Sequence, residues 1–148
     1  MNTEIYLDNA ATTCTREEVL NEMIPYFNNV YGNPSSVYKI ARESKKSLDN
    51  ARETIAKLLG EEASEIYFTG SGTESDNWAI MGVCESLMEK GNHIITTAIE
   101  HHAVLHTCQY LEKIGFEVTY VPVDEFGIVN VKDIENAIKP NTILISVM

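Results

Sequence analysis

The sequence has little cysteine and no closely spaced cysteine pair. Cys14, Cys84 and Cys108 are an odd number at wide spacings, which favours reduced thiols over a disulfide framework. Without a CxxC motif, a zinc ribbon is not indicated either. We therefore expect a protein of a reducing compartment.

Long hydrophobic runs are also lacking. No stretch approaches the ~18 consecutive apolar residues of a membrane-spanning helix, and the N-terminal segment MNTEIYLDNAATT has neither a basic leader nor a continuous apolar run. Apolar residues nevertheless make up 44% of the 148 residues, which is ordinary for a globular chain. We expect a soluble, cytoplasmic protein that does not bind a membrane.

Positive charge is scarce. Eleven basic and 22 acidic side chains give a net charge of −11, and such a surface repels nucleic acid and anionic lipid. The one basic cluster consists of Lys39, Arg42, Lys45 and Lys46, spaced to share one face of a helix. This spacing is typical of a solvated helix face, so nucleic acid is not an expected partner.

The first part of the chain is predicted to be helical. A helix is expected from Thr15, with Glu18 as its capping-box partner. A longer helix is expected after the GNPSS segment, capped by one of its two serines and ending near Leu59, with Gly60 just beyond.

Strand-like and helical segments alternate over the remainder. Strands are expected at residues 66–69, 93–98, 116–123 and 142–147. Helices are expected at 73–90 and 101–114, with Gly91 and Gly115 as their C-caps, and a short one after the N-cap Asn130. The alternation predicts an α/β fold with a mostly parallel sheet flanked by helices.

The turn GSGTES (70–75) has two interpretations. Ligands of open α/β sheets bind beyond the carboxyl ends of the strands, where a helix N-terminus presents unpaired N–H groups to an anion. Gly70 to Thr73 can hold a phosphate in this way, although neither GxGxxG nor a Walker A motif is present. Alternatively, Ser71 with Glu74, or Thr73 with Asp76, forms an ordinary capping box.

A second polar junction, EHHAVL (100–105), is expected at the same edge of the sheet. A histidine there can stack on a ring and move protons near neutral pH; a polar helix cap is the other interpretation of His101 or His102. His102 and His106 lie four apart on one helix face, but no third metal ligand is evident. No metal site is predicted.

Six motifs follow one another along the chain: YLDNAATT (6–13), YGNPSS (31–36), EIYFTGSGTESDN (65–77), HIITTAIEHHAVL (93–105), GFEVTYVPVDEFG (115–127) and TILISVM (142–148). In this order they resemble the N-terminal motifs of the NifS/IscS-type cysteine desulfurases. Those are pyridoxal 5′-phosphate (PLP) enzymes of the aspartate-aminotransferase fold, class V. Cys14, Tyr38 and Ala41 depart from the pattern, standing where Pro, His and Gly are common.

The resemblance implies a site and an activity. Gly72 and Thr73 correspond to the pair that holds the PLP phosphate, and His101 to the catalytic histidine that stacks on the pyridine ring. Family enzymes convert L-cysteine to L-alanine and pass the sulfur to an enzyme cysteine as a persulfide for iron–sulfur cluster assembly. They act as homodimers with a sulfur-accepting scaffold protein.

The resemblance also implies a single incomplete domain over residues 1–148. We expect an N-terminal arm (1–14), a helical segment (15–60) and a βαβαβαβ part of the PLP-binding large domain (61–148), with the C-terminal half missing. The sequence ends inside an apolar strand, whereas domain boundaries usually fall in exposed polar segments. Because strands from further along the family's chain separate 66–69 from the other strands, we expect this strand to be detached, or the sheet to be rearranged or completed by a partner.

The reactive groups of the family have no match among these residues. None of the eight lysines follows Ser-x-His, and none of the three cysteines matches the persulfide cysteine. We therefore expect an N-terminal portion of a cysteine desulfurase that is inactive alone. A non-catalytic remnant or interaction module with at most weak PLP or phosphate binding is the alternative, and a small flavodoxin-type domain is disfavoured by the abrupt end at SVM.

Overall fold

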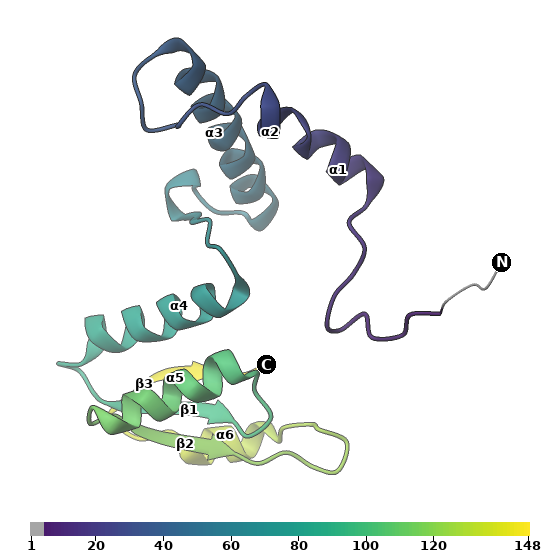
Figure 1. Cartoon of the computed structure of the whole chain (residues 1–148). Helices are drawn as coiled ribbons and strands as arrows, with labels where there is room; N and C mark the ends of the chain where they lie inside the picture. The colour runs from purple at the N-terminus through teal and green to yellow at the C-terminus, as the bar shows by residue number, and fades with distance from the viewer. Residues whose placement is uncertain (1–4) are drawn as a thin grey trace. The chain divides into compact units, whose positions relative to one another are not determined.

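The computed structural model describes residues 5–148. The chain forms two compact units, one ending at Tyr67 and the other comprising Phe68–Met148, and each is considered by itself (Figure 1). Within the described range, no helix combines the length and the apolar content required to cross a membrane. The predicted limits of the arm and the helical segment stay predictions.

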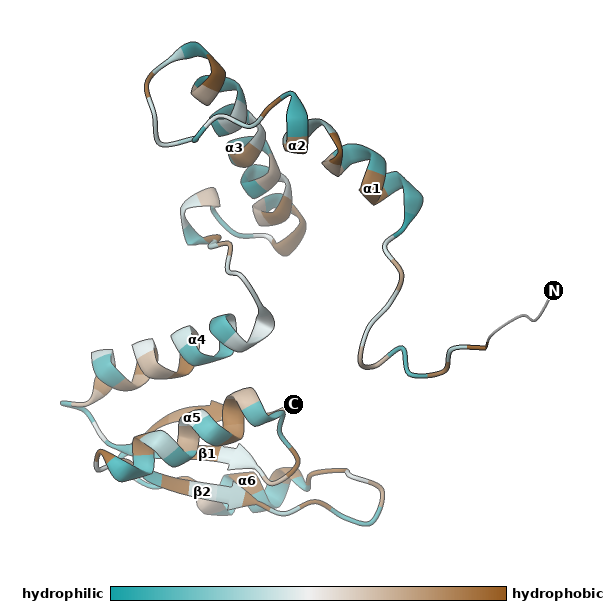
Figure 2. Cartoon of the chain, in the orientation of Figure 1, coloured by the Kyte–Doolittle hydropathy of each residue, from teal (hydrophilic) through white to brown (hydrophobic). Residues whose placement is uncertain are grey.

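The first unit is helical. It contains α1 (Glu17–Met23), α2 (Pro25–Asn28), α3 (Lys39–Leu59) and a 3-10 turn, η1 (Ala63–Glu65). Figure 2 shows hydrophilic and hydrophobic residues alternating along α3, which is typical of a helix with one apolar face. Gly60 ends α3 as predicted, with a φ of 78° in the left-handed region that glycine favours.

Two helix starts in this unit differ from the prediction. α1 begins after Arg16 instead of with a Thr15 capping box, and α3 begins after Tyr38 instead of at the serines of GNPSS. Neither Arg16 nor Tyr38 provides a side-chain cap. The polar residues that signalled a cap therefore lie in the connecting turns, where Asn33 Oδ1 accepts a hydrogen bond from Ser35 N at 2.9 Å.

The second unit contains the sheet. Its elements are α4 (Gly72–Leu87), β1 (His93–Thr97), α5 (His102–Lys113), β2 (Glu117–Val121), α6 (Val131–Ala137) and β3 (Thr142–Ser146). The strands run in the order β2-β1-β3, and β1 pairs in parallel with both neighbours. The predicted parallel sheet flanked by helices is confirmed.

The strand predicted at residues 66–69 is wrong. These residues belong to no strand and pair with none in the described part of the chain. A strand exists only where a neighbouring strand accepts its hydrogen bonds, and an apolar run alone does not supply that neighbour. The segment instead leads into α4 without forming a strand.

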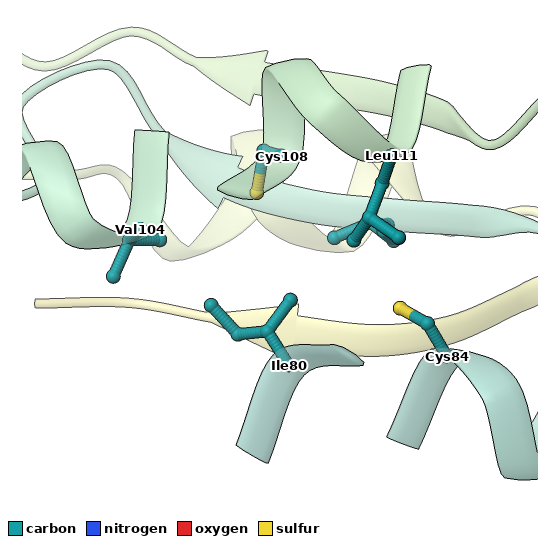
Figure 3. Close-up of a cluster of buried hydrophobic side chains, with 6 residues drawn as sticks. Ile80, Cys84, Val104, Cys108 and Leu111 are labelled. Atoms are coloured by element: carbon teal, nitrogen blue, oxygen red, sulfur yellow. The ribbon is translucent and has the colours of Figure 1, made fainter. Parts of the chain in front are cut away.

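The core lies between the sheet and two helices on one of its faces. Residues from α4, β1 and α5 form a buried cluster, shown in part in Figure 3: Ile80, Cys84, Ile94, Val104, Cys108 and Leu111. α6 lies on the other side of the sheet (Figure 1), as a right-handed crossover from β2 over β1 to β3 requires. The shared cluster packs α4 against α5.

Gly91 has a different role from the predicted one. α4 ends at Leu87, and Gly91 does not have the positive φ of a helix-ending glycine. A Cβ at Gly91 would overlap the backbone of Asn141, so glycine allows the segment before β1 to approach the segment before β3. Gly115, after α5, does have a positive φ, 104°, and Asn130 caps α6 as predicted.

A buried histidine joins all three strands. His93, fully buried at the start of β1, places Nδ1 2.7 Å from Thr142 Oγ1 on β3 and Nε2 2.8 Å from Thr119 Oγ1 on β2. Burial holds the pKa of His93 below its ordinary value of 6.5, and the Lys139 cation adds to this while Glu117 opposes it.

This lowered pKa predicts a loss of stability in acid. Because the unfolded chain binds a proton at His93 more readily than the folded chain, the free energy of unfolding should fall as the pH drops below 6.5. His93→Gln removes this titration. Relative to wild type, the free energy of unfolding of the variant should therefore rise as the pH is lowered from about 7.5 to about 5.5, as measured by urea unfolding. If the difference in the free energy of unfolding between wild type and variant does not change over this pH range, the lowered pKa of His93 is contradicted.

Candidate cofactor-binding site

The first turn of α4 is capped by its own segment. Ser71 Oγ accepts a hydrogen bond from Glu74 N at 3.2 Å, and Ser71 O accepts one from Ser75 N at 3.1 Å. The Glu74 side chain folds back, and its Oε2 accepts from Gly70 N at 2.6 Å. Ser71 therefore caps α4 as predicted, but the capping box with Glu74 is not complete, because the carboxylate accepts from Gly70 N and not from Ser71 N.

This capping leaves two donors at the N-terminus of α4. Among the described residues, no acceptor lies in hydrogen-bond reach of Gly72 N or Thr73 N. Gly72 has no positive φ, and a Cβ built on it would meet no atom within 4 Å. Neither backbone strain nor packing calls for glycine here, so the residue leaves open space beside two free N–H groups, which suits an anion.

The junction between β1 and α5 is fixed by a buried carboxylate. Glu100 is 7% exposed, and its Oε1 accepts hydrogen bonds from Thr97 Oγ1 and from Met148 N, both at 2.7 Å. Thr97 ends β1, and Met148 follows β3. The carboxylate therefore ties the carboxyl ends of two strands to the segment that carries His101.

His101 is the N-cap of α5. Its Nδ1 accepts a hydrogen bond from Ala103 N at 3.1 Å, which confirms the interpretation of this histidine as a polar cap. Because Nδ1 is the acceptor, the neutral ring carries its proton on Nε2. The cap therefore leaves Nε2 as the ring atom that can hold or deliver a proton.

Thr73 and His101 line one pocket. It has a volume of about 340 Å³ and opens between α4 and α5, with walls formed mainly by Thr73, Asn77, Met81, His101, His102, His106 and Tyr110. The structure thus brings together two residues that the sequence placed at one sheet edge, and Gly72 directly precedes Thr73. The sequence analysis did not identify Asn77 or Tyr110 as site residues. For Asn77 one signal was available, because asparagine is a poor helix former and its place inside a helix suggests a specific role.

The other two histidines of this pocket stack on one another. The rings of His102 and His106 have centroids 5.1 Å apart and planes inclined by 25°. Within residues 5–148, no group of three or more His, Cys, Asp or Glu side chains is placed to hold a metal ion.

Two of the three cysteines belong to the core. Burial raises the pKa of both the Cys84 and the Cys108 thiol to about 11, and both pack in the apolar cluster (Figure 3). At neutral pH such thiols are protonated and poorly nucleophilic. Cys14 is exposed in the first unit.

The chain belongs to the aminotransferase class-V family, whose model matches residues 5–148. The cofactor of this class is PLP. The two free N–H groups at the α4 N-terminus fit its phosphate, because they present donors and a positive dipole end beside open space.

The relatives within this class are cysteine desulfurases, which confirms the resemblance to the NifS/IscS type. The chain is 57% identical over 148 residues to cysteine desulfurase IscS of Clostridium botulinum, all of this chain and 37% of that protein. Among solved structures, a NifS-like protein matches with a TM-score of 0.94 and 44% identity, over 99% of this chain and 40% of that one. "SspA in complex with cysteine" matches with a TM-score of 0.89 and 42% identity, over 96% and 41%. The chain therefore spans well under half the length of these relatives.

Thiol modification tests the placement of the cysteines. Near pH 7, a thiol reagent should modify one cysteine of the folded chain rapidly and the other two only after unfolding, because Cys84 and Cys108 are buried with raised pKa values. Cys14→Ser should remove the rapid phase. Rapid modification of Cys14→Ser in the folded state would show that a core thiol is accessible.

Proposed function

We propose that this chain forms the phosphate-holding part of the PLP site in a cysteine desulfurase. The observation that carries the proposal is the pair of unpaired N–H groups at Gly72 and Thr73, beside a pocket that Thr73 shares with His101. The family, the cysteine desulfurase names of the relatives and the similarity to SspA, whose structure was solved in complex with cysteine, support it.

The N-terminus of α4 binds the phosphate in this proposal. Gly72 N and Thr73 N donate to the phosphate oxygens, and the dipole of the 16-residue helix adds to the attraction. Glu74 limits the repulsion, because its carboxylate is directed to Gly70 N. Ser71 satisfies the next two N–H groups of the helix, so the anion needs to engage only the two that remain.

His101 acts on the ring side of the cofactor. PLP, when bound, supplies an electron sink for a carbanion at the substrate carbon. His101 holds a proton on Nε2, because its Nδ1 is engaged by Ala103 N, and this proton is available for acid–base steps. Glu100 keeps the preceding segment attached to β1 and β3.

The full activity is proposed for a longer protein that contains this segment. It comprises conversion of L-cysteine to L-alanine, with the sulfur passed to an enzyme cysteine as a persulfide for iron–sulfur cluster assembly. The proposal includes a cytoplasmic homodimer that delivers sulfur to a scaffold protein. A non-catalytic segment that binds PLP weakly is the second candidate, because none of the eight lysines stands in the Ser-x-His-Lys setting.

Replacing Gly72 tests the phosphate site. Gly72→Ala should preserve the fold, because its Cβ meets no protein atom, yet weaken binding of pyridoxine 5′-phosphate by about tenfold or more by displacing a charge-assisted hydrogen bond. This probe has the ring and the phosphate but no aldehyde, so it forms no covalent bond with lysine. Isothermal titration calorimetry measures the dissociation constants.

Gly82→Ala is the matched control. Gly82 lies further along the same helix, where an added Cβ would make only an ordinary contact with Trp78 at 3.9 Å. It should bind the probe like the wild type. The phosphate site is refuted if Gly72→Ala binds as the wild type does, or if pyridoxine without phosphate binds equally well.

The chain by itself should not convert L-cysteine. None of its eight lysines stands in the Ser-x-His-Lys setting, and Cys84 and Cys108 are buried. Incubation of the purified 148-residue chain with PLP and L-cysteine should therefore yield no alanine, with the Clostridium botulinum relative as the positive control. Alanine formed by the chain alone at a rate comparable with the control would contradict the proposal.

A further inference from the structure

Asn77 and Thr107 join α4 to α5 through their side chains. Thr107 Oγ1 lies 2.7 Å from Asn77 Oδ1 and 2.7 Å from Ala103 O. Asn77 Nδ2 donates to Thr73 O at 2.7 Å and lies 3.5 Å from Ala103 O. The group therefore links the first turn of α4 with the first turn of α5.

The Asn77 amide has one chemically consistent orientation. Its Nδ2 faces the carbonyl oxygens of Thr73 and Ala103, which can only accept, and its Oδ1 faces the Thr107 hydroxyl, which can donate. A flipped amide would place oxygen against two carbonyl oxygens. An aspartate would do the same with a charge, and a leucine would leave all three partners without it.

The same contacts continue to His101. The Thr107 hydroxyl has one proton, which it shares between Asn77 Oδ1 and the Ala103 carbonyl oxygen, and the Ala103 N–H donates to His101 Nδ1 at 3.1 Å. A continuous series of hydrogen bonds thus runs from Thr73, through Asn77 and Thr107, to the cap of α5. Its two ends, Thr73 and His101, line the same pocket.

Apolar packing alone does not accurately set the distance between Thr73 on α4 and His101 at the start of α5. The cluster beneath the two helices is held by non-directional burial, whereas hydrogen bonds depend on distance and angle. Thr107 is 4% exposed, so its bonds form away from water, where such bonds are stronger and a missing partner costs more.

We propose that Asn77 is a positioning residue that fixes the phosphate-binding turn of α4 relative to His101 on α5. This inference rests on the proposed function, since it concerns the spacing between the phosphate-binding turn and His101 within the proposed site. Asn77 acts through Thr73 and Ala103 and is not assigned a chemical step.

Three substitutions test the inference in the 148-residue chain. Asn77→Leu and Thr107→Val remove the polar link at similar volume, and Thr107→Ser retains the hydroxyl. Two quantities are measured: the affinity for pyridoxine 5′-phosphate, and the ¹⁵N signals of the His101 ring, which report its tautomer. Circular dichroism melting confirms that each variant is folded.

Asn77→Leu and Thr107→Val should each weaken probe binding by about threefold to tenfold and move the His101 ring away from the Nε2–H tautomer. Thr107→Ser should retain the wild-type values. The inference is overturned if folded Asn77→Leu and Thr107→Val keep the wild-type affinity and tautomer, or if Thr107→Ser behaves like Thr107→Val. If Asn77→Leu does not fold, the two Thr107 variants decide.

The two measurements separate this inference from the proposed function. If the wild type fails to bind the probe, the phosphate site is wrong. The His101 tautomer still tests the link to Asn77 in that case, because it is measured without ligand. If the wild type binds and neither the affinity nor the tautomer changes in Asn77→Leu and Thr107→Val, the phosphate site stands and the positioning role of Asn77 is wrong.

Discussion

The packing of α4 and α5 against one face of β1 is the interaction on which the site depends. Ile80 and Cys84 of α4 meet Ile94 of β1 and Leu111 of α5 in a single buried cluster. This packing brings Thr73 and His101 to the same pocket although they lie far apart in the sequence. Without the cluster, each residue would be an ordinary helix-start residue.

Hydrogen bonding then decides which groups at this edge are available. Ser71 and Glu74 satisfy part of the α4 N-terminus, and Gly72 N and Thr73 N remain free among the described residues. The net charge of −11 repels a phosphate, but salt screening limits the range of this repulsion to about 8–10 Å at physiological ionic strength. Two directed N–H groups and a helix dipole act at contact distance, so the local donors can outweigh the acidic surface.

Local signals predicted much of the fold, and tertiary partners explain the rest. Gly60, Gly115 and Asn130 marked helix ends correctly because left-handed glycines and asparagine caps act within one turn. Residues 66–69 have a strand-like pattern, but pairing requires a neighbour that the local sequence does not specify. The role of Gly91 differs from the predicted cap because its approach to Asn141 involves a segment distant in the sequence.

Some residues of the site could likewise be predicted from the local sequence, whereas others depend on tertiary contacts. Gly72, Thr73 and His101 were identified because they lie at predicted helix starts, within motifs that resemble those of the cysteine desulfurases. The Asn77–Thr107 bond was missed because it joins side chains 30 residues apart on two helices. The bond from Met148 N to Glu100 spans 48 residues, and only the register of β1 and β3 brings those two residues together.

A ¹H–¹⁵N NMR titration of the 148-residue chain with pyridoxine 5′-phosphate shows whether the N-terminus of α4 binds the phosphate. We expect the largest saturable shifts at the amides of Gly72 and Thr73 and at the ring of His101. Shifts confined to the basic helix face around Lys39 to Lys46, or no saturable shift at the α4 N-terminus, would contradict this expectation.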